Sequence, residues 1–288
     1  MRPAAADDRL FLRNVIWFGS IHLLPLGALV TGASASVWVA AAVLYWVRIW
    51  FVTAGYHCYF AHRAFKTSRA FQFVLALGAA TSGQGSALRW AAAHRYHHAH
   101  SDRDLDLHSP VKRSFWYAHM GWLFSTRYLA PSEPRSGPFV HYPELVWLER
   151  HSNVPTFTLM GITLLLWGLP GFFIAFGLST ILVYHATFTV NSLAHVFGSR
   201  PYPTTDDSRN NWFVAVIMLG GGWHNNHHRY PQSARQGIKW WEWDPTYYAL
   251  VALTWIGVVW DLKLPRQLGH EVRDEAVHGA EVVQDPVR

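Results

Sequence analysis

Half of the histidines in this chain stand in four short segments. In chain order the segments read HCYFAH, HRYHH, NSLAH and HNNHH. Their nine histidines are His57, His62, His94, His97, His98, His195, His224, His227 and His228. HRYHH and HNNHH space their histidines at i, i+3 and i+4, which places three imidazoles on one face of a helix. Each of these two triads can therefore aim at a single point.

The other two segments differ in spacing. Asn191 and His195 are four residues apart, so they share one face of a helix. His57 and His62 are five residues apart and would diverge on a continuous α-helix. We expect that helix to end between them, with the chain turning so that both imidazoles point inward.

Nine imidazoles are more than one metal ion can hold. A structural zinc takes four ligands and a catalytic zinc usually three, whereas two ions with four or five ligands each would use the whole set. Imidazole suits iron, copper, zinc and nickel. The single cysteine, Cys58, excludes a cysteine-based zinc or iron–sulfur site. The pattern therefore predicts two metal ions held mainly by histidine.

The remaining histidines carry weaker signals. His100 and His108 lie beside three aspartates, Asp102, Asp104 and Asp106. These carboxylates either orient ligand imidazoles or form an acidic loop in water. We interpret the other histidines as ordinary hydrogen-bonded surface or core residues: His22, His119, His141, His151, His185, His270 and His278.

Long apolar segments must position these clusters. The chain is 51% hydrophobic and only 15% charged, a composition more apolar and less charged than is usual for a soluble protein of 288 residues. A membrane crossing takes about 20 apolar residues, and the segments from Val15 and from Ser36 have that length. A third block, 154–190, is long enough for two crossings, with Pro170 and Gly171 in the turn between them. We predict an all-α integral membrane protein: four transmembrane helices in two hairpins, with a cytoplasmic helical cap around the histidines.

The distribution of charge supports this topology. Of the 24 Lys and Arg, all except Arg48 fall on the side that carries both termini and all four histidine segments. By the positive-inside tendency that side is cytoplasmic. The net charge of +6 then reflects topology, and the scattered basic residues form no stripe for nucleic acid. Shorter apolar runs from Phe71 and Tyr247 are expected at the membrane interface or packed on the domain.

A cleaved signal peptide is the alternative interpretation of the first crossing. The small residues 33–35 have the form of a cleavage site. The long apolar stretch before them, and the acidic Asp7 and Asp8, argue against cleavage. With the crossing retained, all the histidine segments meet at one membrane face, which favours an apolar substrate and iron–oxygen chemistry.

Several segments together resemble one enzyme family. HCYFAHRAFKT, HRYHH followed by HSP and GW, NSLAH, SRNNW and WHNNHH are similar to the membrane fatty acyl desaturases of the stearoyl type, which form a cis double bond at carbon nine. The resemblance runs from about Tyr56 to Pro265. It implies two non-haem irons, with Asn191 reaching one of them through a water. One iron would take His57, His62 and members of the triads, and the other the remaining triad members and His195. Which triad member serves which iron stays open.

The resemblance also implies a closed tunnel that bends the acyl chain. Its bend would be shaped by the residues matching Gln84, Trp90 and Thr187, for which plain helix packing is the alternative. Ala92 and Ala93 replace a charged pair of the animal acyl-CoA enzymes, so acyl-CoA and acyl-lipid both stay open as carriers. Gly221 replaces a glutamate of the family.

The chemistry implied by the resemblance uses O2 and two electrons to remove one hydrogen from each of two adjacent methylenes. The chain shows no flavin, nicotinamide or haem-domain motif, so a separate ferredoxin, or cytochrome b5 with its reductase, must supply the electrons. A sibling membrane di-iron hydroxylase is the nearest rival. A metal transporter is disfavoured because the ligand segments lie outside the crossings. We expect one desaturase domain, 1–265, and a polar tail, 266–288.

Overall fold

The computed structural model describes residues 9–126 and 137–265. The expected tail from Arg266, together with His270 and His278, lies outside these ranges. Within them the regular structure is mostly helical. Its one sheet is a short antiparallel pair, β1 (Lys66–Thr67) with β2 (Val259–Trp260).

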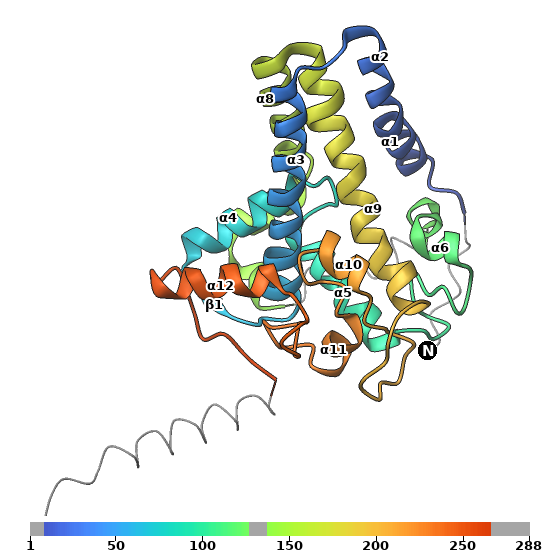
Figure 1. Ribbon diagram of the computed structural model, residues 1–288, viewed down its shortest axis with the longest axis vertical. Helices are drawn as coiled ribbons and strands as arrows, with labels where there is room; N and C mark the ends of the chain where they lie inside the picture. The colour runs from blue at the N-terminus through green and yellow to red at the C-terminus, as the bar shows by residue number, and fades with distance from the viewer. Residues whose placement is uncertain (1–8, 127–136, 266–288) are drawn as a thin grey trace, which may run out of the picture.

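Long helical segments form a bundle at one end of the molecule (Figure 1). They are α1 (Leu12–Leu23), η1 (Leu24–Gly27), α2 (Ala28–Thr31), α3 (Ala35–Trp50), the π-helix η2 (Phe51–Ala61), α8 (Val154–Pro170), the π-helix η6 (Gly171–Leu178), α9 (Ser179–Ser192) and η7 (Leu193–His195). Three continuous stretches of the described chain have the length and apolar character of a membrane crossing, namely Leu12–Thr31, Ala35–Ala61 and the 42-residue Val154–His195.

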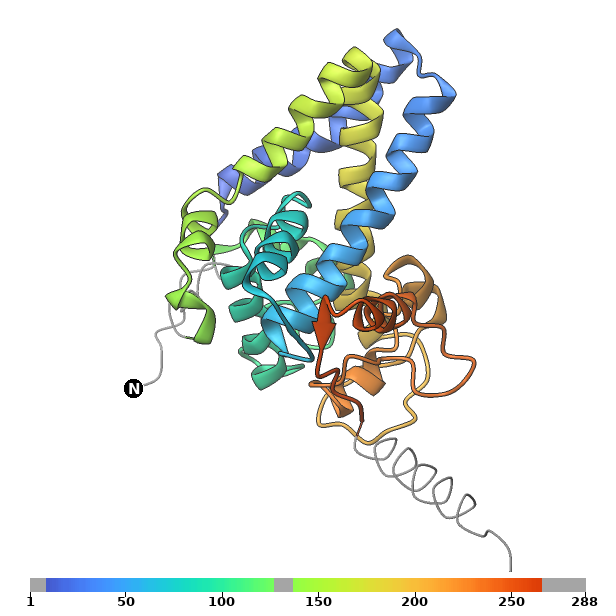
Figure 2. The same cartoon turned by 90° about the vertical axis from the view of Figure 1, so that its left-hand side faces the viewer.

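The third stretch reverses direction near its middle. Gly168 makes the reversal with a φ of 63°, a conformation that favours glycine. Pro170 and Gly171, predicted to form the turn, already continue into the next helix, where Pro fits the first turn. A Cβ at Gly171 would lie 2.2 Å from the carbonyl oxygen of Thr163, so glycine lets the two arms approach closely. Figure 2 shows α8 rising to this turn and α9 returning beside it.

Shorter helices gather at the opposite end of the molecule. They are α4 (Arg69–Ala80), α5 (Ala87–His100), α6 (Phe115–His119), η3 (Gly121–Phe124), η5 (Pro138–His141), α7 (Pro143–Arg150), α10 (Trp212–Ile217), α11 (His224–Arg229) and α12 (Pro245–Trp255). The apolar helices α4 and α12, with 12 and 11 residues, are too short to span a bilayer. Both lie across the foot of α3, as expected for these two runs (Figure 1).

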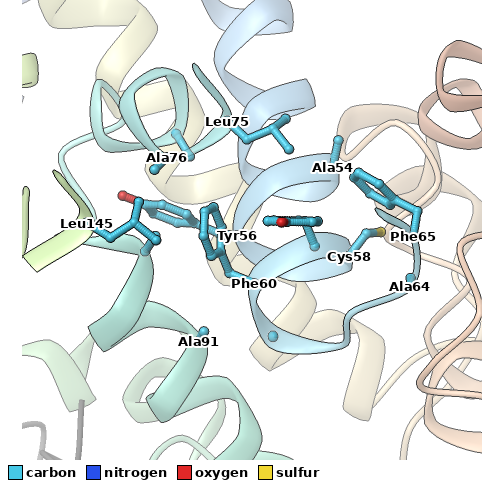
Figure 3. Packing of buried hydrophobic residues seen from close by; sticks show 14 of the residues in the cluster. Ala54, Tyr56, Cys58, Phe60, Ala64, Phe65, Leu75, Ala76, Ala91 and Leu145 are labelled. Carbon is cyan, nitrogen blue, oxygen red and sulfur yellow. The ribbon is translucent and has the colours of Figure 1, made fainter. Parts of the chain in front are cut away.

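The largest apolar core surrounds the lower end of the α3–η2 helix. Tyr56, Phe60, Leu75, Leu145 and Leu250 are each at most 1% exposed, and they come from η2, α4, α7 and α12. Figure 3 shows Tyr56 and Phe60 between Leu75 and Leu145. Close packing of this kind leaves few alternative rotamers, so it fixes the segment that carries His57.

Arg48 is the one basic residue inside a predicted crossing, and its charge is satisfied within the bundle. The side chain is 1% exposed. Its guanidinium donates hydrogen bonds to the carbonyl oxygen of Leu44, to Thr180 Oγ1 at 2.9 Å and to Ser179 Oγ. Such internal pairing is the usual condition for a charged side chain among apolar helices.

Candidate metal centre

All nine predicted ligand histidines converge at the foot of the bundle, in two groups. The five-histidine group consists of His57, His62, His94, His98 and His227, and the four-histidine group consists of His97, His195, His224 and His228. Within each group, one ring nitrogen from every histidine lies within 4.8 Å of the others. Side chains up to 171 positions apart in sequence are thus brought to two points.

The spacing of the two triads suggested that each triad aims at a single point, but the structure divides each of them between the two groups. On α5, His94 and His98 join the five-histidine group, whereas His97 joins the other. On α11, His224 and His228 go together and His227 goes to the opposite group. With 3.6 residues per turn, positions i and i+4 differ by about 40° around the helix, and position i+3 lies about 60° to the other side. Each helix therefore serves both groups.

A π-helix brings His57 and His62 together. The helix η2 ends at Ala61, between the two histidines as predicted. We expected a turn of the chain to bring the two imidazoles together, but the π-helix does so instead. The His62 N–H donates to the carbonyl oxygen of His57 at 3.2 Å, an i to i+5 bond. In this wider helix residues five apart lie nearly above one another. The two ring centroids are 4.9 Å apart.

Within the groups, ring nitrogens face ring nitrogens. Nε2–Nε2 distances of 2.8 to 3.0 Å join the pairs His57–His227, His62–His94, His94–His98, His98–His227 and His195–His224. His97 Nε2 and His228 Nε2 are buried without a hydrogen-bond partner among the described residues. Lone pairs that converge in this way, with no proton between them, repel one another and fit a cation instead. The donor sets suit iron.

Buried carboxylates hold three histidines of the four-histidine group. His97 Nδ1 lies 2.9 Å from Asp106 Oδ1, and His195 Nδ1 lies 2.8 Å from Asp102 Oδ2. A third partner, Asp206, lies 2.7 Å from His228 Nδ1. A carboxylate at Nδ1 fixes the tautomer that leaves Nε2 free for a metal.

The aspartates of the 102–106 loop were predicted either to orient ligand imidazoles or to face water, and the structure shows both roles. Asp102 and Asp106 orient ligand histidines, whereas the Asp104 side chain is 93% exposed and lies 3.4 Å from Lys112. His100 Nδ1 donates a hydrogen bond to the carbonyl oxygen of Tyr96 at 2.9 Å.

Burial keeps most of these imidazoles neutral. Desolvation, together with the neighbouring histidines, lowers the pKa well below the usual value for His62, His94, His98, His224 and His227. Burial also lowers the pKa of His97, but the charge and hydrogen bond of Asp106 outweigh it and the net shift is upward. Burial would raise the pKa of Asp102, yet the hydrogen bond from His195 lowers it to about 2. Neutral imidazoles beside ionised aspartates are the forms that bind a metal ion.

A buried amide network positions α11, and the sequence prediction missed it. Asn210 Oδ1 accepts the backbone N–H groups of Asn225 and Asn226 at 3.0 and 3.1 Å. The Asn226 amide donates to Glu242 Oε2 at 2.7 Å. The asparagines within SRNNW and HNNHH were the available signal. Asp206 offered none, since it stands 22 residues before its histidine in an ordinary polar loop.

The histidines interpreted as structural include a hydrogen-bonded chain behind the cavity wall. His185 contacts His22 through Nε2 at 3.0 Å and His119 through Nδ1 at 2.9 Å. His119 Nδ1 also lies 3.0 Å from Ser192 Oγ. The chain joins α1, α6 and α9 and contributes no ligand to either group. His108 is buried 3.9 Å from Asp106 and makes a further cluster with His97.

A cavity of about 660 Å³ reaches the five-histidine group at His94. Gln84, Trp90 and Thr187 line it and bond to one another, because Trp90 Nε1 donates to Gln84 Oε1 at 3.3 Å and Gln84 Nε2 donates to Thr187 Oγ1 at 3.0 Å. Asn191 and His94 lie on the same wall. The three residues predicted to shape a tunnel are therefore one polar unit beside the histidines.

A smaller cavity of about 50 Å³ lies against both histidine groups. Its wall includes His57 and His94 of one group and His97 and His224 of the other, together with Asn191 and Gly221. Gly221, which the resemblance sets in the place of a glutamate, lines this cavity. Of the two alanines that replace a charged pair, Ala93 lines the larger cavity and Ala92 is buried.

Comparison with known proteins agrees with this geometry. The family model for fatty acid desaturases matches residues 12–258. The chain belongs to the fatty acid desaturase family. It is 35% identical over 260 residues to the acyl-CoA C20 Delta5-desaturase of Anemone leveillei, and the match covers 88% of this chain and 82% of that protein. It is 33% identical over 283 residues to the delta-9 acyl-lipid desaturase 2 of Arabidopsis thaliana, covering 92% and 91%. With the palmitoyl-monogalactosyldiacylglycerol delta-7 desaturase of Arabidopsis thaliana the identity is 34%, covering 86% and 67%.

Family membership confirms the predicted enzyme class. The desaturase is an oxygen-dependent oxidoreductase of lipid metabolism with membrane character, and its histidine groups fit a di-iron site. Each relative named above is a desaturase, so the hydroxylase alternative is not favoured. These relatives differ in carrier and in the position of the double bond, which leaves both to be inferred from this chain.

Proposed function

We propose that this desaturase inserts a cis double bond at carbon nine of a saturated acyl chain carried by CoA or by a membrane lipid. The hydrogen-bonded Gln84, Trp90 and Thr187, beside His94 in the large cavity, carry this proposal. A hydrogen-bonded unit in the cavity wall beside the histidines can hold the acyl chain in one bent shape, and the bend selects the bond that reacts. The delta-9 acyl-lipid relative supports carbon nine.

We propose that the two histidine groups each hold one iron ion. The five-histidine group would hold one ion, and the four-histidine group the other, with Asn191 linked to its iron through a water. When bound, the irons supply the redox chemistry that consumes O2 and two electrons. The protein's own share is positioning: the buried histidines fix the ions, and the cavity wall keeps the methylenes beside them and away from bulk water.

The proposed arrangement in the membrane has four crossings in two hairpins. The 42 residues of Val154–His195 would extend about 63 Å as one helix, twice the thickness of the hydrocarbon layer. The reversal at Gly168 supports two crossings instead. We place the helical cap, both termini and the metal centre on the cytoplasmic side, from the distribution of Lys and Arg.

The partners proposed are the acyl substrate, O2, membrane lipid and a separate electron donor. Arg103, Lys112 and Arg113 are exposed on the cap and suit an acidic donor such as a ferredoxin or cytochrome b5 with its reductase. No nucleic-acid partner is proposed. Residues 1–265 would form the desaturase domain and residues 266–288 a polar tail.

The test is fatty-acid analysis, with location of the double bond, in a bacterial host that expresses the chain with a ferredoxin system. We expect a new cis-9 monoene from the wild type and its loss in His227→Ala, which removes one buried ligand. His151→Ala is the matched control, because its imidazole bonds only to the carbonyl oxygen of Trp147 in its own helix region.

A hydroxy acid as product would move the protein to the sibling hydroxylases. A monoene at another carbon would keep the desaturase and reject carbon nine. Product formation by His227→Ala at the wild-type rate would reject the histidine groups as the metal centre.

A further inference from the structure

The two histidine groups differ in what surrounds them. In the four-histidine group, three imidazoles donate Nδ1–H to Asp102, Asp106 and Asp206 at 2.7 to 2.9 Å. In the five-histidine group, no imidazole contacts a carboxylate within residues 9–126 and 137–265. The polar contacts given for those five rings are to other imidazoles and, at 3.8 Å, to the Cys58 thiol.

The three aspartates are buried carboxylates whose side-chain partners are histidines and, for Asp102, also Ser109. Their side chains are 4%, 0% and 8% exposed for Asp102, Asp106 and Asp206. No Lys or Arg in the described chain forms an ion pair with any of them. Each carboxylate accepts hydrogen bonds, but a buried carboxylate is still stabilised by a nearby positive charge, so three around one point favour a cation at that point.

Asp102 also holds the loop that carries Asp206. Its Oδ2 accepts from His195 Nδ1 and from the Asp207 N–H, both at 2.8 Å, and its Oδ1 accepts from Ser109 at 2.6 Å. The four-histidine group is thereby assembled by protein contacts alone. A preformed site spends less of its binding free energy on ordering its ligands.

We propose that the two metal sites are unequal: the four-histidine group binds its iron first and more tightly than the five-histidine group. The inference rests on the proposed di-iron centre. Three carboxylates make the histidine ligands more basic and attract the cation directly. The other ion is held by five imidazoles whose outer partners carry no charge. Asp102, Asp106 and Asp206 act here as positioning residues.

Anaerobic titration of the metal-free full chain with ferrous iron tests this, with affinities from competition against a ferrous chelator and Mössbauer spectra of 57Fe. We expect one quadrupole doublet at one equivalent, a second doublet at two, and a second Kd at least about tenfold weaker. Asp206→Asn should weaken the tight site about 10- to 100-fold and change the weak one less than about twofold. His62→Ala should remove the weak site and keep the tight one. The matched control Asp104→Asn should change neither.

Equal affinities for two ions, a tight site lost in His62→Ala, or both sites equally weakened in Asp206→Asn would each overturn the inequality. Uptake of fewer than two ions by the wild type would instead overturn the di-iron centre itself. Circular dichroism checks that Asp206→Asn is folded. If it is not, Asp106→Asn and His62→Ala decide the matter by the same criteria.

Discussion

At the scale of single residues, the centre depends on imidazoles that stay neutral when buried. Five ligand histidines have a pKa well below the usual value, because burial disfavours their charged form. His97 is the exception, since Asp106 raises its pKa. The same burial that prepares the ligands therefore couples the stability of the metal-free chain to pH.

We expect the metal-free protein to lose stability as the pH falls from about 7 to about 5. In the unfolded chain the histidines bind protons near pH 6.5, whereas five of them stay unprotonated in the folded chain, so acid favours unfolding. The raised pKa of His97 acts in the opposite direction, but five histidines with a lowered pKa outweigh this single contribution. The thermal midpoint in detergent at pH 7.5 and 5.5 measures the effect, and His94→Gln should flatten the slope. An unchanged or higher midpoint at pH 5.5 would contradict it.

The tunnel residues allow a second prediction at this scale. Thr187→Val keeps the shape of the side chain but leaves the Gln84 amide without its acceptor. We expect a slower reaction, roughly 10-fold, and a product mixture with the double bond moved along the chain, since the bend is no longer held at one place. Thr189→Val is the matched control, because the Thr189 hydroxyl donates to the carbonyl oxygen of Ala186 in its own helix and does not line the large cavity. Equal products from wild type and Thr187→Val would show that the trio only packs.

At the scale of elements, the turn between α10 and α11 aims the last triad. A Cβ at Gly222 would lie 2.0 Å from the backbone nitrogen of Ala215, whereas a Cβ at Gly221 would come no closer than 3.1 Å to the Met218 side chain and 3.4 Å to its carbonyl oxygen. We expect Gly222→Ala to cost about 1–3 kcal/mol of unfolding free energy and to displace α11. Gly221→Ala should cost much less. Thermal unfolding and iron content compare the two, and equal effects would refute this account of the turn.

Much of the centre was predictable from sequence because its ligands stand in compact boxes on helices. The nine histidines, Asn191 and the trio around Gln84 could be named from spacing and resemblance. The assignment of His97 and His227 could not, because it depends on the angle at which α5 and α11 face each other. The register of η2 and the role of Asp206 were also hidden, since a π-helix and a distant loop leave no local pattern.

At the scale of the whole molecule, the reversal at Gly168 bears on how the chain crosses the membrane. The proposed four crossings would place the 32–34 turn and the 168–171 turn on one face and the cap on the other. The single cysteine, Cys58, is buried, so its replacement gives a background for labelling at chosen positions.

In a Cys58→Ala background, we expect Ser34→Cys to react with an impermeant thiol reagent from outside the cell. Gln232→Cys, exposed on the cap, should react only in inside-out vesicles. Opposite accessibility is the direct consequence of an odd number of crossings between the two positions. Labelling of both from the same side would reject the four-crossing arrangement.

The sharing of α5 and α11 between both histidine groups has a consequence for how such an enzyme can diverge. Since α5 and α11 each carry histidines of both groups, the geometry of these helices would set the distance between two bound ions, with little influence from loops or from the thickness of the membrane. Much of the wall of the large cavity comes from other segments, including α1, α7 and α9, although α5 contributes Arg89, Trp90, Ala93 and His94. The shape of the substrate cavity can therefore change while the two histidine groups stay as they are. Desaturases named for carbons five, seven and nine fit such a division.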